Sequence, residues 1–339
     1  MVEEKIKRSK IGKFLSLMAA VLLVTVVLLA ACTPPKPAQQ FTLRIGWFSA
    51  PDYLPYFVMV EGGFAKNNRL QFEEIEYQGG AAVIDAMTAG LADVGSIGSV
   101  PVISAAERGL IPDKVVAVAA NSFADPDHPS NGVLVASSVN TWQDLKGKLI
   151  AVVAINSING AGIKGRLKLE GISDYKLVEI SFVNQGLAVA GGNVAAASMI
   201  EPFLTQSLLR GDGKLLDWVI GGPPFERLEN TLIVFRSDLC HSNPEAVKAF
   251  LRAYLQAVKW IDQNPGKARL ILAKRLGISP EVAQKMKLLR FPLDGRNDPA
   301  MLESMQPVLI NVGMLKKPIP AKQLYDETLL GEVLKERKK

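Results

Sequence analysis

A cysteine, Cys32, stands where an apolar N-terminal segment ends, and its thiol could carry a lipid. The 17-residue run 14–30 follows five lysine or arginine side chains, and the small residues Ala30 and Ala31 stand directly before the cysteine. A charged start, an apolar stretch and small residues before a cleavage point are typical of a secretory signal. With cysteine next, the pattern predicts a lipoprotein signal peptide over 1–31 and acylation of Cys32, for example by palmitate. A retained transmembrane helix is the alternative, because 17 residues is close to the shortest length that spans a membrane.

Residue sets for covalent or metal catalysis are missing from the sequence. There is no G-x-S-x-G, H-E-x-x-H or P-loop motif, and the chain has only two histidines and two cysteines. Transition-metal sites usually need several such ligands close together. We therefore predict a protein that is not an enzyme, with no catalytic residues, no metal and no cofactor.

A glycine motif in the second half of the chain is similar to a cofactor-binding pattern. Residues 160–165 read G-x-G-x-x-G, with Glu179 about twenty residues further on, which is similar to a dinucleotide-binding fingerprint. The fingerprint requires its first glycine at the turn between strand and helix, whereas the preceding strand is expected to end about five residues earlier. Close approach of a helix to its sheet is the simpler explanation of these glycines.

Polar or glycine-containing segments recur directly before the predicted helices. In the first half of the chain these segments are 49–53, 78–80, 96–99 and 121–122, which contain Ser49, Tyr53, Gln78, Gly79, Ser96, Ser99 and Asn121. In the second half they are 156–160 and 200–203, which contain Asn156, Ser157, Asn159, Glu201 and Phe203. Open α/β sheets bind ligands outside the carboxyl ends of their strands, where helix N-termini offer free N–H groups. Any one such segment is also explained as a helix cap, but six of them predict a shared cleft.

The elements that must position these residues alternate along the chain. We expect strands at 43–47, 71–77, 93–96, 115–120, 132–136, 149–154, 177–182, 195–200 and 231–235. Helices are expected at 53–64, 81–89, 99–108, 160–170, 186–190, 202–209, 244–263, 266–276, 280–288 and 299–312. Such alternation is typical of parallel strands with crossover helices. The predicted fold class is therefore α/β, with two doubly wound lobes.

Proline-rich segments indicate the domain organisation. Residues 32–41 are expected to form a tether. We place the first lobe at 42–131 plus 231–339 and the second at 132–230, with the chain crossing twice between them. Removal of the signal peptide leaves a net charge of about +3, too small to suggest nucleic-acid binding.

Three short motifs give a resemblance to a known family. They are the segment 79–95, which begins Gly-Gly and ends Ala-Asp-Val-Gly; 144–148, which reads Asp-Leu-Lys-Gly-Lys; and 195–203, which ends Glu-Pro-Phe. In this order the chain, from about 43 to 312, resembles the solute-binding proteins of ABC importers for nitrate, sulfonate, taurine and thiamine-pyrimidine precursors. The resemblance implies the type II periplasmic-binding fold and carries the ligand contacts onto the candidate residues given above.

The resemblance also implies a function and partners. We expect an extracytoplasmic monomer that is anchored to the cell membrane by lipid. It is expected to capture a small polar or heterocyclic organic solute, either sulfonate- or taurine-like or pyrimidine-like, in the cleft between the lobes and to deliver it to an ABC permease and its ATPase. None of the candidate segments carries Lys or Arg, so an amine or N–H donor is favoured if Glu201 faces the cleft; otherwise Glu201 is structural. Tyr53 and Phe203 could stack on a ring or serve in the core. The alternatives are an exported enzyme, a structural lipoprotein and the sensor domain of a regulator.

Overall fold

The computed structural model describes Met1 and residues 40–337 of the chain, which divides into Met1–Gln40 and Phe41–Lys339. The predicted signal peptide, Cys32 and the tether up to residue 39 lie outside the described residues. The description below concerns residues 40–337.

The first sheet contains five strands in the order β2-β1-β3-β10-β4. Their bounds are β1 (Phe41–Trp47), β2 (Leu70–Glu76), β3 (Val94–Gly98), β4 (Val115–Ala124) and β10 (Leu228–Arg236). β1 runs parallel to β2 and β3, whereas β10 runs antiparallel to β3 and β4. Every residue of β4 is buried: its side chains enter the core clusters on both faces of the sheet, and bridges from Phe123 to Arg290 and from Ala117 to Tyr325 cover its outer edge.

The second sheet also contains five strands, in the order β7-β6-β8-β5-β9. Their bounds are β5 (Asn131–Val135), β6 (Leu149–Val152), β7 (Lys176–Glu179), β8 (Ala196–Ile200) and β9 (Lys214–Ile220). β6 is parallel to β7 and β8, whereas β5 is antiparallel to β8 and β9. The predicted α/β class is confirmed, but each sheet is mixed rather than parallel. β5 and β10 are antiparallel because each receives the chain from the other sheet.

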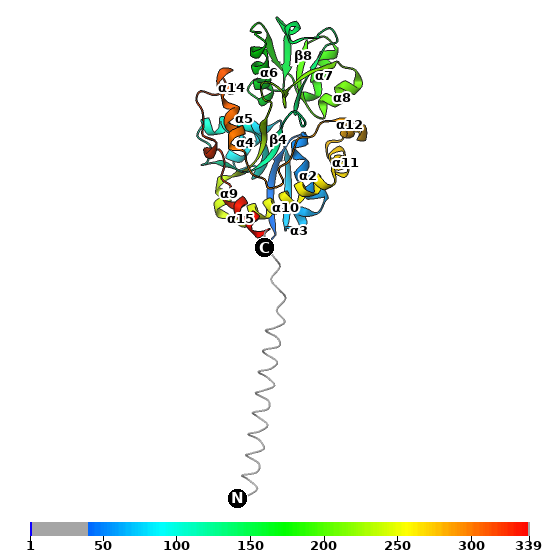
Figure 1. Cartoon of the computed structure of the whole chain (residues 1–339). Helices are drawn as coiled ribbons and strands as arrows, with labels where there is room; N and C mark the ends of the chain where they lie inside the picture. The colour runs from blue at the N-terminus through cyan, green and yellow to red at the C-terminus, as the bar shows by residue number, and fades with distance from the viewer. Residues whose placement is uncertain (2–39, 338–339) are drawn as a thin grey trace. The chain divides into compact units, whose positions relative to one another are not determined.

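Helices cover both faces of each sheet, as the ribbon in Figure 1 shows. On one face of the first sheet lie η1 (Pro51–Tyr53), α2 (Leu54–Glu61), α3 (Phe64–Asn67), α10 (Pro244–Gln263), α11 (Pro265–Leu276), α12 (Pro280–Lys285) and α15 (Thr328–Glu336). On the other lie α4 (Gly80–Thr88), α5 (Ser99–Glu107), α13 (Pro299–Ser304), α14 (Gln306–Asn311) and η3 (Ala321–Gln323). α9 (Ser237–Ser242) follows β10. The second sheet has η2 (Trp142–Leu145) and α6 (Ile158–Leu169) on one face, and α7 (Phe182–Ala190) and α8 (Phe203–Arg210) on the other.

Local sequence explains most of these helices. α10 begins at a proline and buries one continuous stripe of apolar side chains, from Ala246 to Ile261, so its bounds match the expected 244–263. The single helix expected at 299–312 is instead two, α13 and α14, because Pro307 lacks the N–H that would continue the hydrogen-bond ladder.

The two segments that connect the sheets lie side by side. Ser130 N donates to Ile220 O at 3.0 Å, so the end of β9 lies beside the segment that leads into β5. Gly221, with φ of +84°, begins the return segment, and a Cβ there would come within 2.5 Å of Pro129 Cα. Only glycine accommodates both the left-handed backbone and this close approach.

The glycine motif at 160–165 lies in α6. A Cβ on Gly165 would come within 2.7 Å of Pro224 and 3.0 Å of Val308, and one on Gly162 within 3.0 Å of Val219. These glycines therefore let α6 approach β9 and α14 closely, which supports the packing explanation.

Candidate functional site

The carboxyl ends of the parallel strands of both sheets lie toward each other. β4 leads into β5, whose first residue, Asn131, is paired with Ile200 at the end of β8. Ile200 packs against the core cluster of the first sheet that contains Tyr53, and Ala161 of α6 lies in the cluster that contains Val100 of α5. We call these facing ends the carboxyl edges; they are where an open α/β sheet binds ligands.

Asp52 is the centre of a polar cluster at the carboxyl edge of the first sheet. Its Oδ1 atom accepts hydrogen bonds from Ser122 Oγ at 2.8 Å, Asn230 Nδ2 at 3.0 Å and Thr231 Oγ1 at 3.1 Å. The residue is 8% exposed, and burial raises the pKa of its carboxyl group although these three donors lower it. All three partners are neutral, so this carboxyl group has no counter-charge among them.

Two predicted residues, Ser96 and Asn121, belong to this Asp52 cluster. The amide Nδ2 of Asn121 lies 2.9 Å from Asp52 O, 2.8 Å from Ser96 Oγ and 2.9 Å from Thr231 Oγ1. We expected Asn121 in a loop after its strand, but β4 continues to Ala124. Register shifts between β4 and β10 around Thr231 let both Asn121 and Ser122 reach that residue, which a regular alternation would prevent.

Tyr53 lies in the core beside this cluster. Its side chain is 1% exposed, and its hydroxyl lies 3.0 Å from both Gly46 O and Ser96 O. Its ring also meets Trp47 and Phe57. The structure therefore gives Tyr53 a packing role beneath the edge.

Three candidates lie at the rim and are not brought into the Asp52 cluster. Ser49 is half-buried, with its Oγ 3.5 Å from Glu76 Oε1. Gln78 is exposed, and Gly79 is half-buried directly before α4.

Three buried polar side chains at the two carboxyl edges have a donor atom without a hydrogen-bond partner among the described residues. Ser99 Oγ begins α5 after β3, Asn159 Nδ2 lies in the first turn of α6 after β6, and Asn131 Nδ2 lies at the start of β5. Each residue is at most 4% exposed, and no partner for these atoms exists among residues 40–337. A buried donor without a partner costs about 1–3 kcal/mol, so each requires an explanation.

The other candidates before α6 have local roles. Ser157 is the N-cap of the helix: its Oγ accepts from Gly160 N at 3.3 Å and donates to Ala154 O at 2.6 Å. Asn156 is exposed. Of this segment, only Asn159 is both buried and left with a free donor.

Glu201 forms hydrogen bonds with elements that pack on both sheets. Its carboxylate accepts from Thr205 N and Thr205 Oγ1 in α8 and from Lys287 N, at 3.0–3.1 Å, and Lys287 follows α12 on the first sheet. The residue is 3% exposed, and burial raises the pKa of its carboxyl group. Phe203 is half-buried and stacks on Phe182, with ring centroids 5.7 Å apart. Sequence reasoning missed Phe182, Asp52, Asn131 and Asn230.

A separate hollow of about 410 Å³ lies beside the Glu201 contact. Its lining includes Lys287, Arg269 and Arg290 together with the acidic Asp127 and Asp262. Side chains of both signs therefore surround it. This hollow could not be predicted from local sequence patterns, because its wall combines α10, α11 and the loop before β5.

Other chemistry in the described part of the chain is limited. Burial raises the pKa of the Cys240 thiol to about 12, so it is a poor nucleophile. Within residues 40–337 we find no group of three or more His, Cys, Asp or Glu placed to hold a metal ion.

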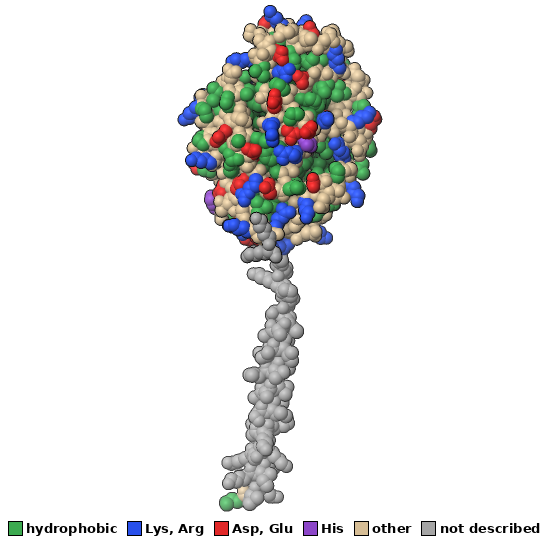
Figure 2. Space-filling model, in the orientation of Figure 1, with side chains coloured by type: hydrophobic (Ala, Val, Ile, Leu, Met, Phe, Trp, Pro, Cys, Tyr) green, Lys and Arg blue, Asp and Glu red, His purple; other side chains and the backbone are tan. Residues whose placement is uncertain are grey.

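No described helix combines the length and apolarity that a membrane span requires. On the face drawn in Figure 2, acidic and basic side chains are interspersed among apolar ones.

Comparisons with known proteins identify the family. The NMT1/THI5-like family model matches residues 50–268. The chain is 24% identical to the taurine-binding periplasmic protein of Escherichia coli over 261 residues, which is 74% of this chain and 70% of the relative. The periplasmic nitrate-binding protein NrtA of Synechocystis PCC 6803 has a similar structure, with a TM-score of 0.73 and 17% identity over 88% of this chain and 89% of that one.

The fold is also shared by an enzyme. The desulfurization enzyme DSZB aligns with a TM-score of 0.68 and 16% identity, over 88% of this chain and 100% of the enzyme. Fold similarity alone therefore does not decide between binding and catalysis. The family predicted from the loop motifs is nevertheless confirmed: the chain belongs to the NMT1/THI5-like family and has the fold of periplasmic binding proteins.

Proposed function

We propose that this protein is the extracytoplasmic solute-binding component of an ABC importer, which captures a small polar organic solute between the two carboxyl edges and delivers it to a permease and its ATPase. The taurine-binding relative supports this role. The Asp52 cluster includes no Cys, His or Lys, and the group in it that could act as a general base is the Asp52 carboxyl group itself, so the experiment below tests for turnover as well as for binding.

The observation that carries the proposal is the set of free buried donors at the facing edges. Ser99 comes from the first sheet, whereas Asn131 and Asn159 come from the second. A sulfonate or carboxylate group offers several acceptor oxygens to such donors. A solute that binds donors on both sides favours the closed arrangement by its contacts to each.

We propose that the two lobes correspond to 42–131 plus 231–339 and to 132–230. Movement would occur at the paired connecting segments around Ser130 and Gly221. The contact between Glu201 and Lys287 N would then form or break with closure, because it joins α8 to the loop after α12.

A thermal-shift screen of the purified protein against sulfonates, nitrate, amino acids and pyrimidines tests this function. Binding to the folded state raises the melting temperature by mass action, so one solute class should stabilise the protein and the others should not. Each stabilising solute is then incubated with the protein and recovered. Recovery of unchanged solute supports a binding protein, whereas no stabilising solute, or conversion of one with turnover, would contradict the proposal.

We also propose anchoring through a lipid on Cys32. The position of Cys32 after Ala30 and Ala31 supports this. The experiment is mass spectrometry of the mature N-terminus in wild type and in Cys32→Ala. We expect an acylated cysteine at the wild-type N-terminus and loss of membrane association in the variant; an unprocessed wild-type chain would refute the anchor.

A further inference from the structure

Four basic side chains lie exposed at one end of the first sheet, and we call them the basic surface. They are Lys66 and Arg69, in and just after α3, and Lys335 and Arg337, at the end of α15. None of the four forms an ion pair with another residue of 40–337. Both helices pack on α10, and Figure 1 shows α3, α10 and α15 together at this end. In the sequence, two further lysines follow at 338–339.

The acidic side chains next to the basic surface already have cationic partners. Glu332 of α15 lies 3.1 Å from Lys248 of α10, and Glu336 lies 3.0 Å from Arg252, one turn further along α10. Glu245, at the start of α10, lies 2.7 Å from Lys248. These inner pairs contain three acids and two bases, so with the four outer bases this end has an excess of three positive charges. The four outer bases are thus left without acidic partners.

The chain enters the first sheet at the same end. Phe41 N donates to Arg69 O at 2.8 Å, so the first residue of β1 lies directly beside the basic surface. Only residues 33–40 separate Phe41 from Cys32. A segment of this length spans at most about 30 Å. A lipid on Cys32 would therefore keep the basic surface close to the membrane.

We propose that the basic surface binds the anionic lipid headgroups of the membrane to which Cys32 is anchored. The inference rests on the anchor proposed above, because the lipid brings the surface and the membrane together. Headgroup phosphates supply the acidic partners that the four cations lack within the protein. Each lysine or arginine close to an anionic lipid surface increases affinity about fivefold, and the attraction falls off within a Debye length. The carboxyl edge lies at the other end of β1, so this contact leaves it accessible to solute.

The first test measures vesicle binding without the lipid anchor. The mature chain from residue 32 onward, with Cys32→Ser, is sedimented with vesicles of phosphatidylcholine alone or with about a third of phosphatidylglycerol. An excess of three charges predicts about 100-fold stronger partitioning into the anionic vesicles at low salt, and loss of this preference at about 0.5 M salt. Equal partitioning into both kinds of vesicle overturns the inference. Neither lipidation nor solute enters this measurement, so such a failure leaves the proposed anchor and the proposed solute binding in place.

A second measurement separates a lipid surface from another polyanion. Short duplex DNA carries phosphate groups without a lipid surface, and its binding to the same chain is measured by fluorescence anisotropy at the same salt concentration. We expect weaker binding to DNA than to the anionic vesicles. A tighter complex with DNA would assign the basic surface to nucleic acid and overturn the inference.

The third test locates the contact with paired substitutions. Lys66→Gln combined with Arg337→Gln removes two charges from the basic surface and should weaken partitioning into anionic vesicles about 10- to 30-fold. Lys148→Gln combined with Lys176→Gln is the matched control, because it removes the same charge from exposed side chains at the amino ends of β6 and β7, at the opposite end of the body (Figure 1). The control should keep the affinity within about twofold, since those side chains lie far beyond a Debye length from the lipid. An equal loss in both variants would mean that only the net charge attracts the vesicles, and would overturn the inference.

Discussion

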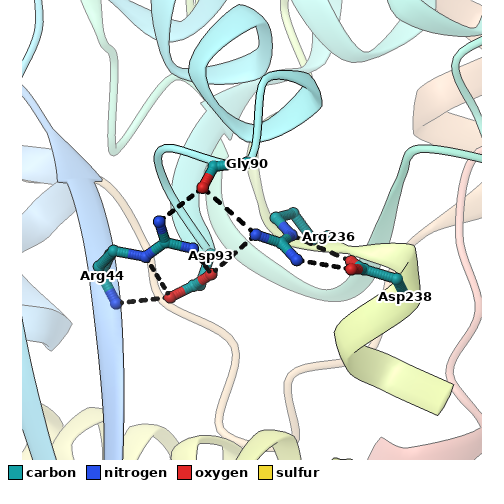
Figure 3. A network of polar contacts seen from close by, with 5 residues as sticks. All are labelled: Arg44, Gly90, Asp93, Arg236 and Asp238. Atoms are coloured by element: carbon teal, nitrogen blue, oxygen red, sulfur yellow. Dashed lines mark hydrogen bonds and ion pairs between the residues drawn. The ribbon is translucent and has the colours of Figure 1, made fainter. Parts of the chain in front are cut away.

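The two ends of the first sheet differ in whether a cation lies beside each carboxyl group. At the end where β3 begins and β10 terminates, Asp93 lies between two guanidinium groups (Figure 3). Its Oδ1 is 2.6 Å from Arg44 Nη2 and 3.4 Å from Arg236 Nη1, and its Oδ2 accepts from Arg44 Nε at 3.0 Å. Arg236 also pairs with Asp238, at 2.5 Å. Both carboxylates at this amino end therefore have fixed cations.

At the carboxyl edge, by contrast, neither buried carboxyl group has a cation beside it among residues 40–337. Asp52 has only neutral donors. Glu229, which is fully buried at the start of β10, accepts from Asp298 N at 2.8 Å through Oε2, and its Oε1 has no partner among the described residues. Compensated charges stabilise a fold, whereas uncompensated polar groups are costly and are retained where a ligand completes them. The comparison therefore supports a stabilising role for the amino end and agrees with the binding proposed above for the carboxyl edge.

The largest expected effect is on the pH dependence of the free energy of unfolding, and it is due to Glu229. Burial, together with Asp298 and Glu327, raises the pKa of this group to about 8, while in the unfolded chain it is near 4.5. The folded protein thus keeps a proton that the unfolded chain has lost, so stability falls as pH rises through this range, by up to about 1.4 kcal/mol per pH unit. Asp52 contributes a slope of the same sign, since its pKa is also raised.

Glu229→Gln should remove much of this slope and make the protein more stable than wild type above a pH of about 8, by roughly 5 kcal/mol at most. Urea unfolding of ligand-free protein across the pH range measures it. Glu281→Gln, an exposed carboxylate of α12, is the control and should leave the slope intact. An unchanged slope in Glu229→Gln would contradict the statement that Glu229 is an uncompensated carboxyl group at the carboxyl edge.

An intermediate effect is expected from Asp93→Asn at the amino end. The substitution leaves Arg44 and Arg236 without their shared carboxylate, which should lower the free energy of unfolding by about 2 kcal/mol, because part of the network is solvent-exposed. Solute affinity should stay unchanged. Urea unfolding and calorimetry together measure both quantities.

Asp85→Asn removes an exposed carboxylate 3.5 Å from Arg108 and should cost less than about 0.5 kcal/mol. If Asp93→Asn costs no more than this control, or if it weakens solute binding, the assignment of stability to the amino end is wrong.

Sequence patterns predicted those parts of the molecule that depend on local chemistry. α10 could be predicted residue by residue because proline, apolar spacing and length all agree. The sequence predicts a ligand contact at Ser157, and the structure shows this residue as a helix cap, since a serine before a helix serves either purpose. β9 was missed because its burial does not alternate, and Leu215 is exposed.

Asp52 was missed for a different reason. Its donors come from Ser122, Asn230 and Thr231, and two of them lie more than a hundred residues away along the chain. In the sequence Asp52 follows Pro51 in a turn and has no distinguishing pattern. Only the crossing of the chain between the two sheets, which returns β10 between β3 and β4, brings these residues together.

The smallest expected effect is on solute affinity, and it should distinguish the Ser99 hydroxyl at the carboxyl edge from the Ser198 hydroxyl inside the second sheet. Ser99 and Ser198 are both fully buried with an Oγ that has no partner among the described residues, but Ser99 lies at the carboxyl edge and Ser198 lies in the middle of β8. Alanine at either position removes an unsatisfied group, so both variants should keep their free energy of unfolding within about 1 kcal/mol of wild type.

Binding should separate the two variants. If Ser99 Oγ donates to the solute, Ser99→Ala weakens affinity by about three- to tenfold, the value of one neutral hydrogen bond, whereas Ser198→Ala stays within about twofold. Calorimetry with the solute found in the screen measures both. Equal affinities in the two variants would mean that the free hydroxyl at the edge is no more functional than the one inside the sheet. The carboxyl edge of the first sheet would then bind through the Asp52 cluster alone.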